Sequence, residues 1–160
     1  MSFIATANPP AHNAEPEVQN DGFFPAINCE NLRKDLRLDG TVTPERLRLA
    51  VTDAMISTNA ELATWRAVQL DAGRTTLADV PAYNLGQESH KLHLYRKAIY
   101  CHVQAQLAES YRDMSTLPEG ANKADRVYTA TEVRTDGHLQ QLRWAIADLQ
   151  GLPRVIAELL

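Results

Sequence analysis

The chain has 160 residues, of which 44% are apolar and 22% are charged, and its formal net charge is −4. This length is typical of one domain, and the composition excludes a fibrous or largely disordered protein. The sixteen basic residues are interleaved with twenty acidic ones, and no apolar run approaches the roughly 20 residues that span a bilayer, so neither a nucleic-acid-gripping face nor a membrane segment is predicted.

The first 22 residues are expected to form a flexible arm, because they contain three prolines and several asparagines and have no apolar period. They also lack the basic start and apolar run of a signal peptide. Phe23 and Phe24 end this arm. Two adjacent aromatic residues after a polar segment are candidate anchors of the arm, either on the chain's own fold, which is the more common case, or on a neighbouring subunit.

Two helices are predicted next. A short one covers residues 28–38. Thr43 is then a candidate N-cap, and Pro44 suits the first position of a helix. A long helix is predicted from there to Gly73. Its apolar face follows steps of three and four residues through Leu47, Val51, Met55, Thr58, Leu62 and Trp65.

Residues 74–86 are expected to be an ordered loop, because Pro81, Asn84 and Gly86 interrupt any period. A third helix, also long, is predicted over about residues 87–114. One of its stripes contains only small side chains, which permit the close approach of another helix. This stripe is a candidate helix-packing or subunit face, formed by Ala98, Cys101, Ala105 and Ala108.

The last long helix is predicted over about residues 123–150, although Gly137 weakens its middle by roughly 1 kcal/mol relative to alanine. Gly151 is a plausible C-cap, and Pro153 prevents the helix from continuing. The residues that follow are too few for another core helix and too apolar for a free end. We therefore expect an extended docking tail over residues 152–160, with contacts from Arg154, Val155, Ile156, Leu159 and Leu160.

The predicted fold class is all-α, an antiparallel bundle of three long helices with a short N-terminal helix. The predicted domain organisation is a flexible arm at residues 1–22, a helical bundle at 23–151 and an extended C-terminal tail at 152–160. The tail is expected to dock on a partner as an added strand or an apolar plug.

No group of residues predicts catalysis. His90 and His93 lie beside Glu88, but no third or fourth metal ligand follows at a recognisable spacing, so exposed histidines are the better interpretation. Cys101 and His102 are consecutive in a helix, where their side chains diverge by about 100° and cannot pair. We expect free thiols in a reducing compartment, no metal, no cofactor and no enzymatic activity.

Eight short segments then become informative through their order and spacing. They lie at residues 23–25, 43–48, 58–62, 77–81, 109–113, 123–125, 142–147 and 153–154. In this order, the chain from about residue 22 to residue 160 resembles the head-completion protein L family of contractile-tailed temperate bacteriophages.

The resemblance implies a structural virion protein that joins the head after DNA packaging. It implies a ring, commonly of twelve subunits, beneath the portal as a head–tail connector adaptor. The implied partners are the portal protein, a tail-terminator or tail-side completion protein, and other copies of the chain. Packaged DNA would pass through without sequence-specific binding. The implied location is the portal vertex of the virion, after synthesis in the host bacterial cytoplasm. No association with a membrane is implied.

The main alternative is a small-terminase-like subunit that recognises DNA for packaging. The helix at residues 28–38 and the Thr43-capped helix could imitate a helix-turn-helix. Basic residues there are offset by acidic ones: Arg33, Lys34, Arg37, Arg46 and Arg48 alternate with Asp35, Asp39 and Glu45. Salt-dependent affinity for DNA would discriminate between the two functions. An enzyme of unknown type is the third alternative.

Overall fold

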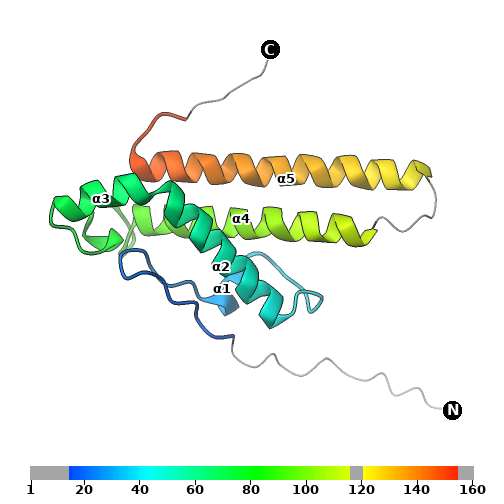
Figure 1. Cartoon of the computed structure of the whole chain (residues 1–160), viewed down its shortest axis with the longest axis horizontal. Helices are drawn as coiled ribbons and strands as arrows, with labels where there is room; N and C mark the ends of the chain where they lie inside the picture. Colours follow the sequence, from blue (N-terminus) through cyan, green and yellow to red (C-terminus); the bar gives the residue numbers. More distant parts are fainter. Residues whose placement is uncertain (1–14, 116–120, 155–160) are drawn as a thin grey trace.

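The structure is a computed structural model that describes residues 15–115 and 121–154, and over residues 111–115 and 121–133 it describes only the helical backbone. The described residues form five α-helices, as Figure 1 shows: α1 (Cys29–Asp35), α2 (Pro44–Glu61), α3 (Ala63–Asp71), α4 (His90–Ser115) and α5 (Ala121–Gln150). They also form a short 3-10 helix, η1 (Leu77–Asp79), and a two-stranded antiparallel hairpin of β1 (Asn84–Leu85) and β2 (Glu88–Ser89). The predicted all-α class is confirmed.

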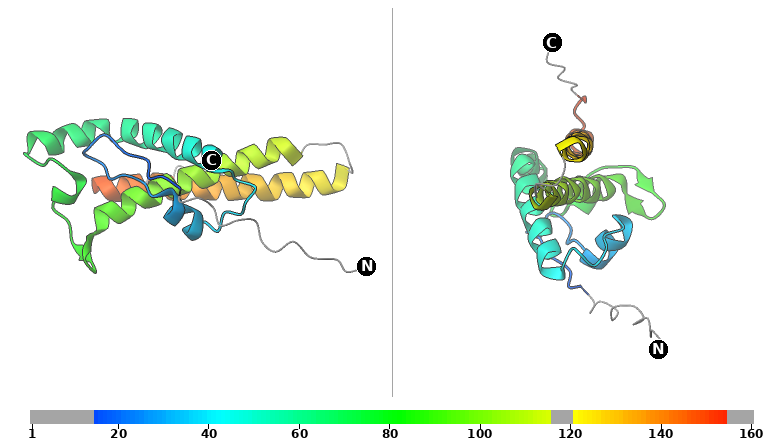
Figure 2. Two further views of the ribbon diagram at one scale, coloured as in Figure 1. Left: turned by 90° about the horizontal axis from the view of Figure 1, so that it is seen from below. Right: turned by 90° about the vertical axis from the view of Figure 1, so that its right-hand side faces the viewer.

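Helix α4 lies in the middle of the molecule (Figures 1 and 2). Helix α5 runs antiparallel along one side of it, and α2 crosses it on another. The β1–β2 hairpin and α2 lie on opposite sides of α4, which is clearest in the right-hand view of Figure 2. At one end, the α4–α5 pair projects beyond α1 and α2. The remaining elements therefore gather around the other end of this pair.

The first two helices begin where the sequence predicts. The Asn28 side chain accepts a hydrogen bond from the Asn31 amide at 2.8 Å, and the Thr43 side chain accepts one from the Arg46 amide at 3.3 Å. These side chains satisfy amides that have no partner inside the helix. Helix α1 ends three residues earlier than predicted, because the chain turns through a left-handed conformation at Arg37, where φ is 52°.

The single helix predicted from residue 43 to residue 73 is wrong in one respect, because it divides at Leu62 into α2 and α3. The backbone of Leu62 has φ −87° and ψ 0°, which interrupts the regular helix. No glycine or proline marks this position in the sequence. The predicted apolar face is otherwise confirmed, since its first five residues are buried: Leu47, Val51, Met55, Thr58 and Leu62.

The segment predicted as a loop contains more regular structure than expected. Within residues 74–86 lie η1 and the first strand of the hairpin, and Gly86 occupies the turn with φ 64°. A positive φ here is accessible to glycine at little cost. Because Glu88 and Ser89 pair with β1, helix α4 begins at His90 and not at residue 87.

Helix α5 is continuous through Gly137 and ends at Gln150. Gly151 has φ 75°, and its amide donates to the Asp148 carbonyl at 3.1 Å, while the Leu152 amide donates to the Ala147 carbonyl at 2.9 Å. These bonds satisfy the last carbonyls of the helix. The predicted C-cap is confirmed.

The predicted arm is only partly compatible with the structure, because residues 15–22 pack on the domain. Val18 and Ile27 exchange two backbone hydrogen bonds of 2.9 and 3.0 Å in an antiparallel bridge. Glu15 is buried and reaches Arg33 of α1. The sequence of this segment has no apolar period, because only isolated side chains are buried and most of its contacts are polar. Residues 1–14 lie outside the described residues.

The hydrophobic core joins residues 15–27, here called the N-terminal segment, to α2, α4 and α5. It includes Phe23, Phe24, Ile27, Leu47, Val51, Leu62, Tyr95, Ile99, Val103, Ile146 and Leu149. Over the described ranges, none of the helices combines the length and the apolarity that crossing a bilayer requires.

Candidate functional site

Histidine, cysteine and acidic side chains are the groups of this chain that could bind a metal or perform catalysis. Across residues 15–110 and 134–154, no three His, Cys, Asp or Glu side chains are placed to hold a metal ion. The His90 ring stacks on Tyr83, with the ring centroids 3.8 Å apart, and its Nδ1 lies 3.1 Å from the Tyr83 carbonyl oxygen. Cys29 and Cys101 are buried free thiols, and burial raises the pKa of both. Elevated thiol pKa values favour structural cysteines over nucleophiles.

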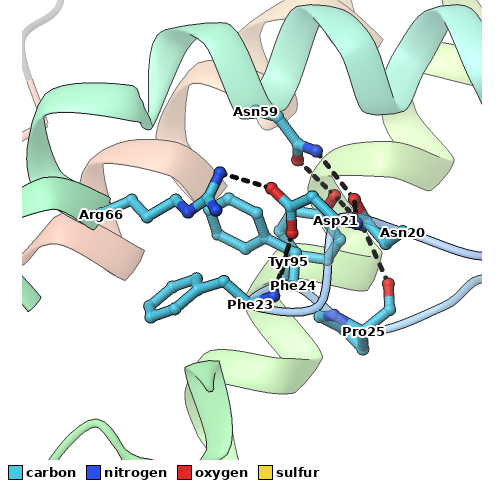
Figure 3. A network of polar contacts seen from close by, with 8 residues as sticks. All are labelled: Asn20, Asp21, Phe23, Phe24, Pro25, Asn59, Arg66 and Tyr95. Carbon is cyan, nitrogen blue, oxygen red and sulfur yellow. Dashed lines mark hydrogen bonds and ion pairs between the residues drawn. The ribbon is translucent and has the colours of Figure 1, made fainter. Parts of the chain in front are cut away.

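A network of polar contacts holds the N-terminal segment against α2 and α4 (Figure 3). The Asn20 amide nitrogen donates to the Tyr95 hydroxyl at 2.8 Å and to the Pro25 carbonyl at 3.0 Å. The Tyr95 hydroxyl donates to the Asn59 side-chain oxygen at 2.6 Å, and the Asn59 side-chain nitrogen donates to the Asn20 side-chain oxygen at 2.8 Å. Burial raises the pKa of Tyr95, so its hydroxyl stays protonated and can donate.

Asp21 extends this network to α3 and fixes the turn before the aromatic pair. One carboxylate oxygen accepts the amides of Phe23 and Phe24 at 3.0 and 3.1 Å. The other accepts from Arg66 at 2.6 Å, and the Arg66 guanidinium lies over the Phe23 ring at 5.7 Å (Figure 3). The network therefore ties one segment to three different helices.

Phe23 and Phe24 are each 3% exposed and lie in the chain's own core. The Phe24 ring stacks on Tyr95 with centroids 4.7 Å apart, and Phe23 meets Trp65 edge-on at 6.3 Å. These contacts are compatible with the alternative in which Phe23 and Phe24 anchor the preceding segment on the chain's own fold. Whether residues 1–14 become ordered on assembly stays a prediction.

The structure places the stripe of small residues on α4 within the chain. Ala98, Cys101 and Ala105 are buried and Ala108 is half-buried. Helix α4 packs against α5 along its length (Figure 1). This burial is compatible with the helix-packing alternative, whereas a contact with another subunit through these residues stays a prediction.

At the C-terminal end, the chain leaves α5 along the surface. Arg154 makes a two-bonded contact with Asp148, with Nε–Oδ1 and Nη2–Oδ2 distances of 2.9 and 2.6 Å, and its guanidinium lies 5.2 Å from the centre of the Trp144 ring. This contact lowers the pKa of Asp148 through the hydrogen bond from Arg154. Residues 151–154 are all exposed. The other candidate docking residues, Val155, Ile156, Leu159 and Leu160, lie outside the described residues.

Two exposed apolar surfaces were not predicted from the sequence. The first is a stripe on the outer side of α2 and α3, here called the apolar stripe, formed by Leu49, Ile56, Ala60, Ala63, Ala67 and Leu70. The second lies on the β1–β2 hairpin and is here called the hairpin tip: Leu85 beside the turn is 59% exposed, and Tyr83, opposite His90 at the base of the hairpin, is 65% exposed. The sequence contained a signal for the first surface: Leu49 and Ile56 are seven residues apart, which places them on one side of the helix, and neither belongs to the predicted buried face.

Comparisons with known proteins show which family the sequence matches. A family model described as "Phage head completion protein (GPL)" matches residues 18–160. A protein of Escherichia phage P2, named head completion/stabilization protein, is 40% identical over 142 residues, which cover 89% of this chain and 82% of the relative. No solved structure matches the chain. The match begins at residue 18, within the segment that the structure shows packed on the domain.

Proposed function

Because this chain belongs to the phage head completion protein family, a family of structural phage proteins and not of enzymes, we propose that it completes the head after DNA packaging. In this role it forms a ring, of about twelve copies by analogy with head–tail adaptors, beneath the portal. The tail attaches to that ring. The observation that carries the proposal is the identity of 40% to a head completion/stabilization protein over most of both chains.

The proposed partners are the portal protein on the head side and a tail-terminator or tail-side completion protein on the other. Other copies of the chain would complete the ring, and the packaged DNA would pass through it. The net charge of −4 supports a conduit that does not grip phosphates. The chain would act at the portal vertex of the virion, after synthesis in the host cytoplasm.

The proposed docking element is the C-terminal segment from Arg154 to Leu160. Two observations support it: residues 151–154 lie exposed on the surface, and the sequence that follows is apolar. Deleting residues 155–160 should abolish recovery of the chain in particles. Deleting residues 1–14, which precede the family match, is the matched control and should leave recovery unchanged. Equal recovery of both truncated chains would contradict C-terminal docking.

The head completion role is tested by deleting the gene and supplying it again in trans. We expect particles without the chain to contain packaged DNA but to carry no tails, because packaging precedes completion. Electron microscopy would count the tails, and the DNA content of purified particles would be measured. Heads that never acquired DNA would contradict the proposal and favour the packaging alternative.

A further inference from the structure

We propose that the apolar stripe of one copy receives the hairpin tip of the next copy, in a head-to-tail contact between neighbouring subunits. The inference rests on the proposed ring and names the two surfaces that join its members. It assigns a partner to the exposed apolar residues of α2, α3 and the hairpin.

The apolar stripe faces away from the core. Leu49 is 62% exposed, Ile56 is 64% exposed and Leu70 is 43% exposed. On α2, Leu49, Ile56 and Ala60 are spaced by seven and four residues and share one side of that helix. On α3, Ala63, Ala67 and Leu70 are spaced by four and three residues and likewise share one side. At 1.5 Å per residue, the part of the stripe on α2, from Leu49 to Ala60, is about 17 Å long, and the part on α3, from Ala63 to Leu70, is about 11 Å long. The outer side of a surface helix is ordinarily polar, so an apolar one of this length indicates an interaction surface.

The hairpin tip is an apolar projection whose conformation is fixed within the chain. The Tyr83 carbonyl accepts a hydrogen bond from the His90 amide at 3.1 Å, and the Tyr83 and His90 rings stack with an angle of 4° between their planes. Glu88 of the hairpin pairs with Arg96 of α4. Residues 81–87 carry no charged side chain. A tip that is already ordered loses little conformational entropy when it binds, so its exposed Tyr83 and Leu85 suit burial against a partner.

The two surfaces lie on opposite sides of the same molecule. Figure 2 shows α2 on one side of α4 and the hairpin on the other. A head-to-tail contact needs two different surfaces, and repetition of that contact closes into a ring when the rotation between copies allows it. Five of the seven large apolar side chains that the described residues expose belong to these two surfaces: Leu49, Ile56, Leu70, Tyr83 and Leu85. One repeated contact would therefore cover most of the exposed apolar side chains.

A cysteine pair tests this contact in assembled particles. The chain would carry Ile56→Cys and Leu85→Cys together, and purified particles would be treated with a short bismaleimide. The native cysteines, Cys29 and Cys101, are 2% and 7% exposed and should not react. We expect a ladder of covalent multimers on a denaturing gel, because each copy is joined to the next. Chains with only one of the two substitutions should stay monomeric.

Two other results of the cross-linking overturn the inference. A chain that stays monomeric with both cysteines, in particles that contain it, shows that the two surfaces do not meet. Covalent dimers from Ile56→Cys alone would show that two stripes face each other instead. If the first pair prevents incorporation, Ala60→Cys with Asn84→Cys places thiols on the same surfaces and keeps their large side chains. Absence of the unsubstituted chain from the vertex would instead overturn the proposed function, which separates the two failures.

Discussion

The two ends of the described chain are held in very different ways. Near the N-terminus, residues 15–27 are fixed by two core phenylalanines, a polar network and a buried ion pair between Glu15 and Arg33. Near the C-terminus, residues 151–154 lie on the surface and are held by two backbone hydrogen bonds to α5 and by the contacts of Arg154, whose side chain is 51% exposed, with Asp148 and Trp144. The N-terminal segment is therefore part of the fold, whereas the C-terminal segment can leave its position at little cost. This difference favours the C-terminal end as the one that docks.

The largest expected effect comes from removing an aromatic anchor of the N-terminal segment. Phe24→Ala should lower the free energy of unfolding by about 3–5 kcal/mol, because it leaves a cavity against Tyr95 in the core. Urea unfolding followed by circular dichroism measures this change. Leu152→Ala at the other end is the control and should change stability by less than about 0.5 kcal/mol, since Leu152 is 55% exposed. Equal losses in both variants would show that the two ends are held alike.

The next effect concerns the buried ion pair. Glu15→Gln should destabilise the chain by about 2–3 kcal/mol, because Arg33 would lose its charged partner while remaining buried. The Arg33 guanidinium would keep its bonds to the carbonyls of Asp39 and Val42 at 3.0 and 2.8 Å, which limits the loss. Glu17→Gln is the matched control at an exposed carboxylate. Urea midpoints that do not differ between the two variants would show that residue 15 is not locked to α1.

A smaller effect is expected at the centre of the polar network. Tyr95→Phe keeps the ring that stacks on Phe24 but removes the hydroxyl shared by Asn20 and Asn59. We expect a loss of about 1–2 kcal/mol, because both amide side chains lose a partner. Thermal unfolding measures it. Tyr83→Phe, at an exposed tyrosine, provides the control. An unchanged melting temperature for Tyr95→Phe would mean that water replaces the hydroxyl without cost.

The smallest effect on stability is expected at the C-terminal ion pair. Asp148→Asn should change the free energy of unfolding by at most about 1 kcal/mol, because the pair is exposed. It should nevertheless accelerate trypsin cleavage after Arg154, whose guanidinium is released. Arg143, which is exposed and makes no ion pair among the described residues, supplies the reference cleavage site. A cleavage rate that stays unchanged would contradict the proposed holding contact.

The same pair predicts a pH dependence. Arg154 lowers the pKa of Asp148 below its ordinary value of 3.8, so the stabilisation is present above the unfolded pKa and is lost as pH falls through the lower folded pKa. Trypsin is inactive there, so hydrogen exchange at residues 151–154 is the suitable measurement. After division by the intrinsic exchange rate at each pH, protection of the amides of residues 151, 152 and 154 should fall below about pH 4 in the unsubstituted chain but not in Asp148→Asn.

Local signals in the sequence predicted much of the fold. The start of α1 at about residue 28, the cap at Thr43, the buried face of α2 and the stop at Gly151 each depend on a few neighbouring residues, and the structure confirms them. The division at Leu62 has no such signal, because neither glycine nor proline marks it. The hairpin had a turn glycine at residue 86, but strands of two residues are too short to show alternation.

The contacts that hold the N-terminal segment could not be predicted, because they join residues far apart in the sequence. Asn20 meets Tyr95 across 75 positions, and Glu15 meets Arg33 across 18. A segment of polar residues and prolines has no apolar period, so it resembles a flexible arm even when single side chains are buried. The exposed apolar stripe was not predicted either. The predicted helix over residues 43–73 has apolar residues on two sides, and only the side that forms the core was recognised.

Cryo-electron microscopy of the portal vertex in particles of the phage that encodes this chain tests the account most directly. We predict a ring of helical subunits between portal and tail, in which residues 15–27 keep the contacts described above and the segment after Arg154 reaches the portal or a neighbouring subunit. The ring should be missing from particles made without the gene. A vertex without this chain, or a ring whose subunits dock through residues 15–27 while the C-terminal segment contacts no partner, would contradict the account.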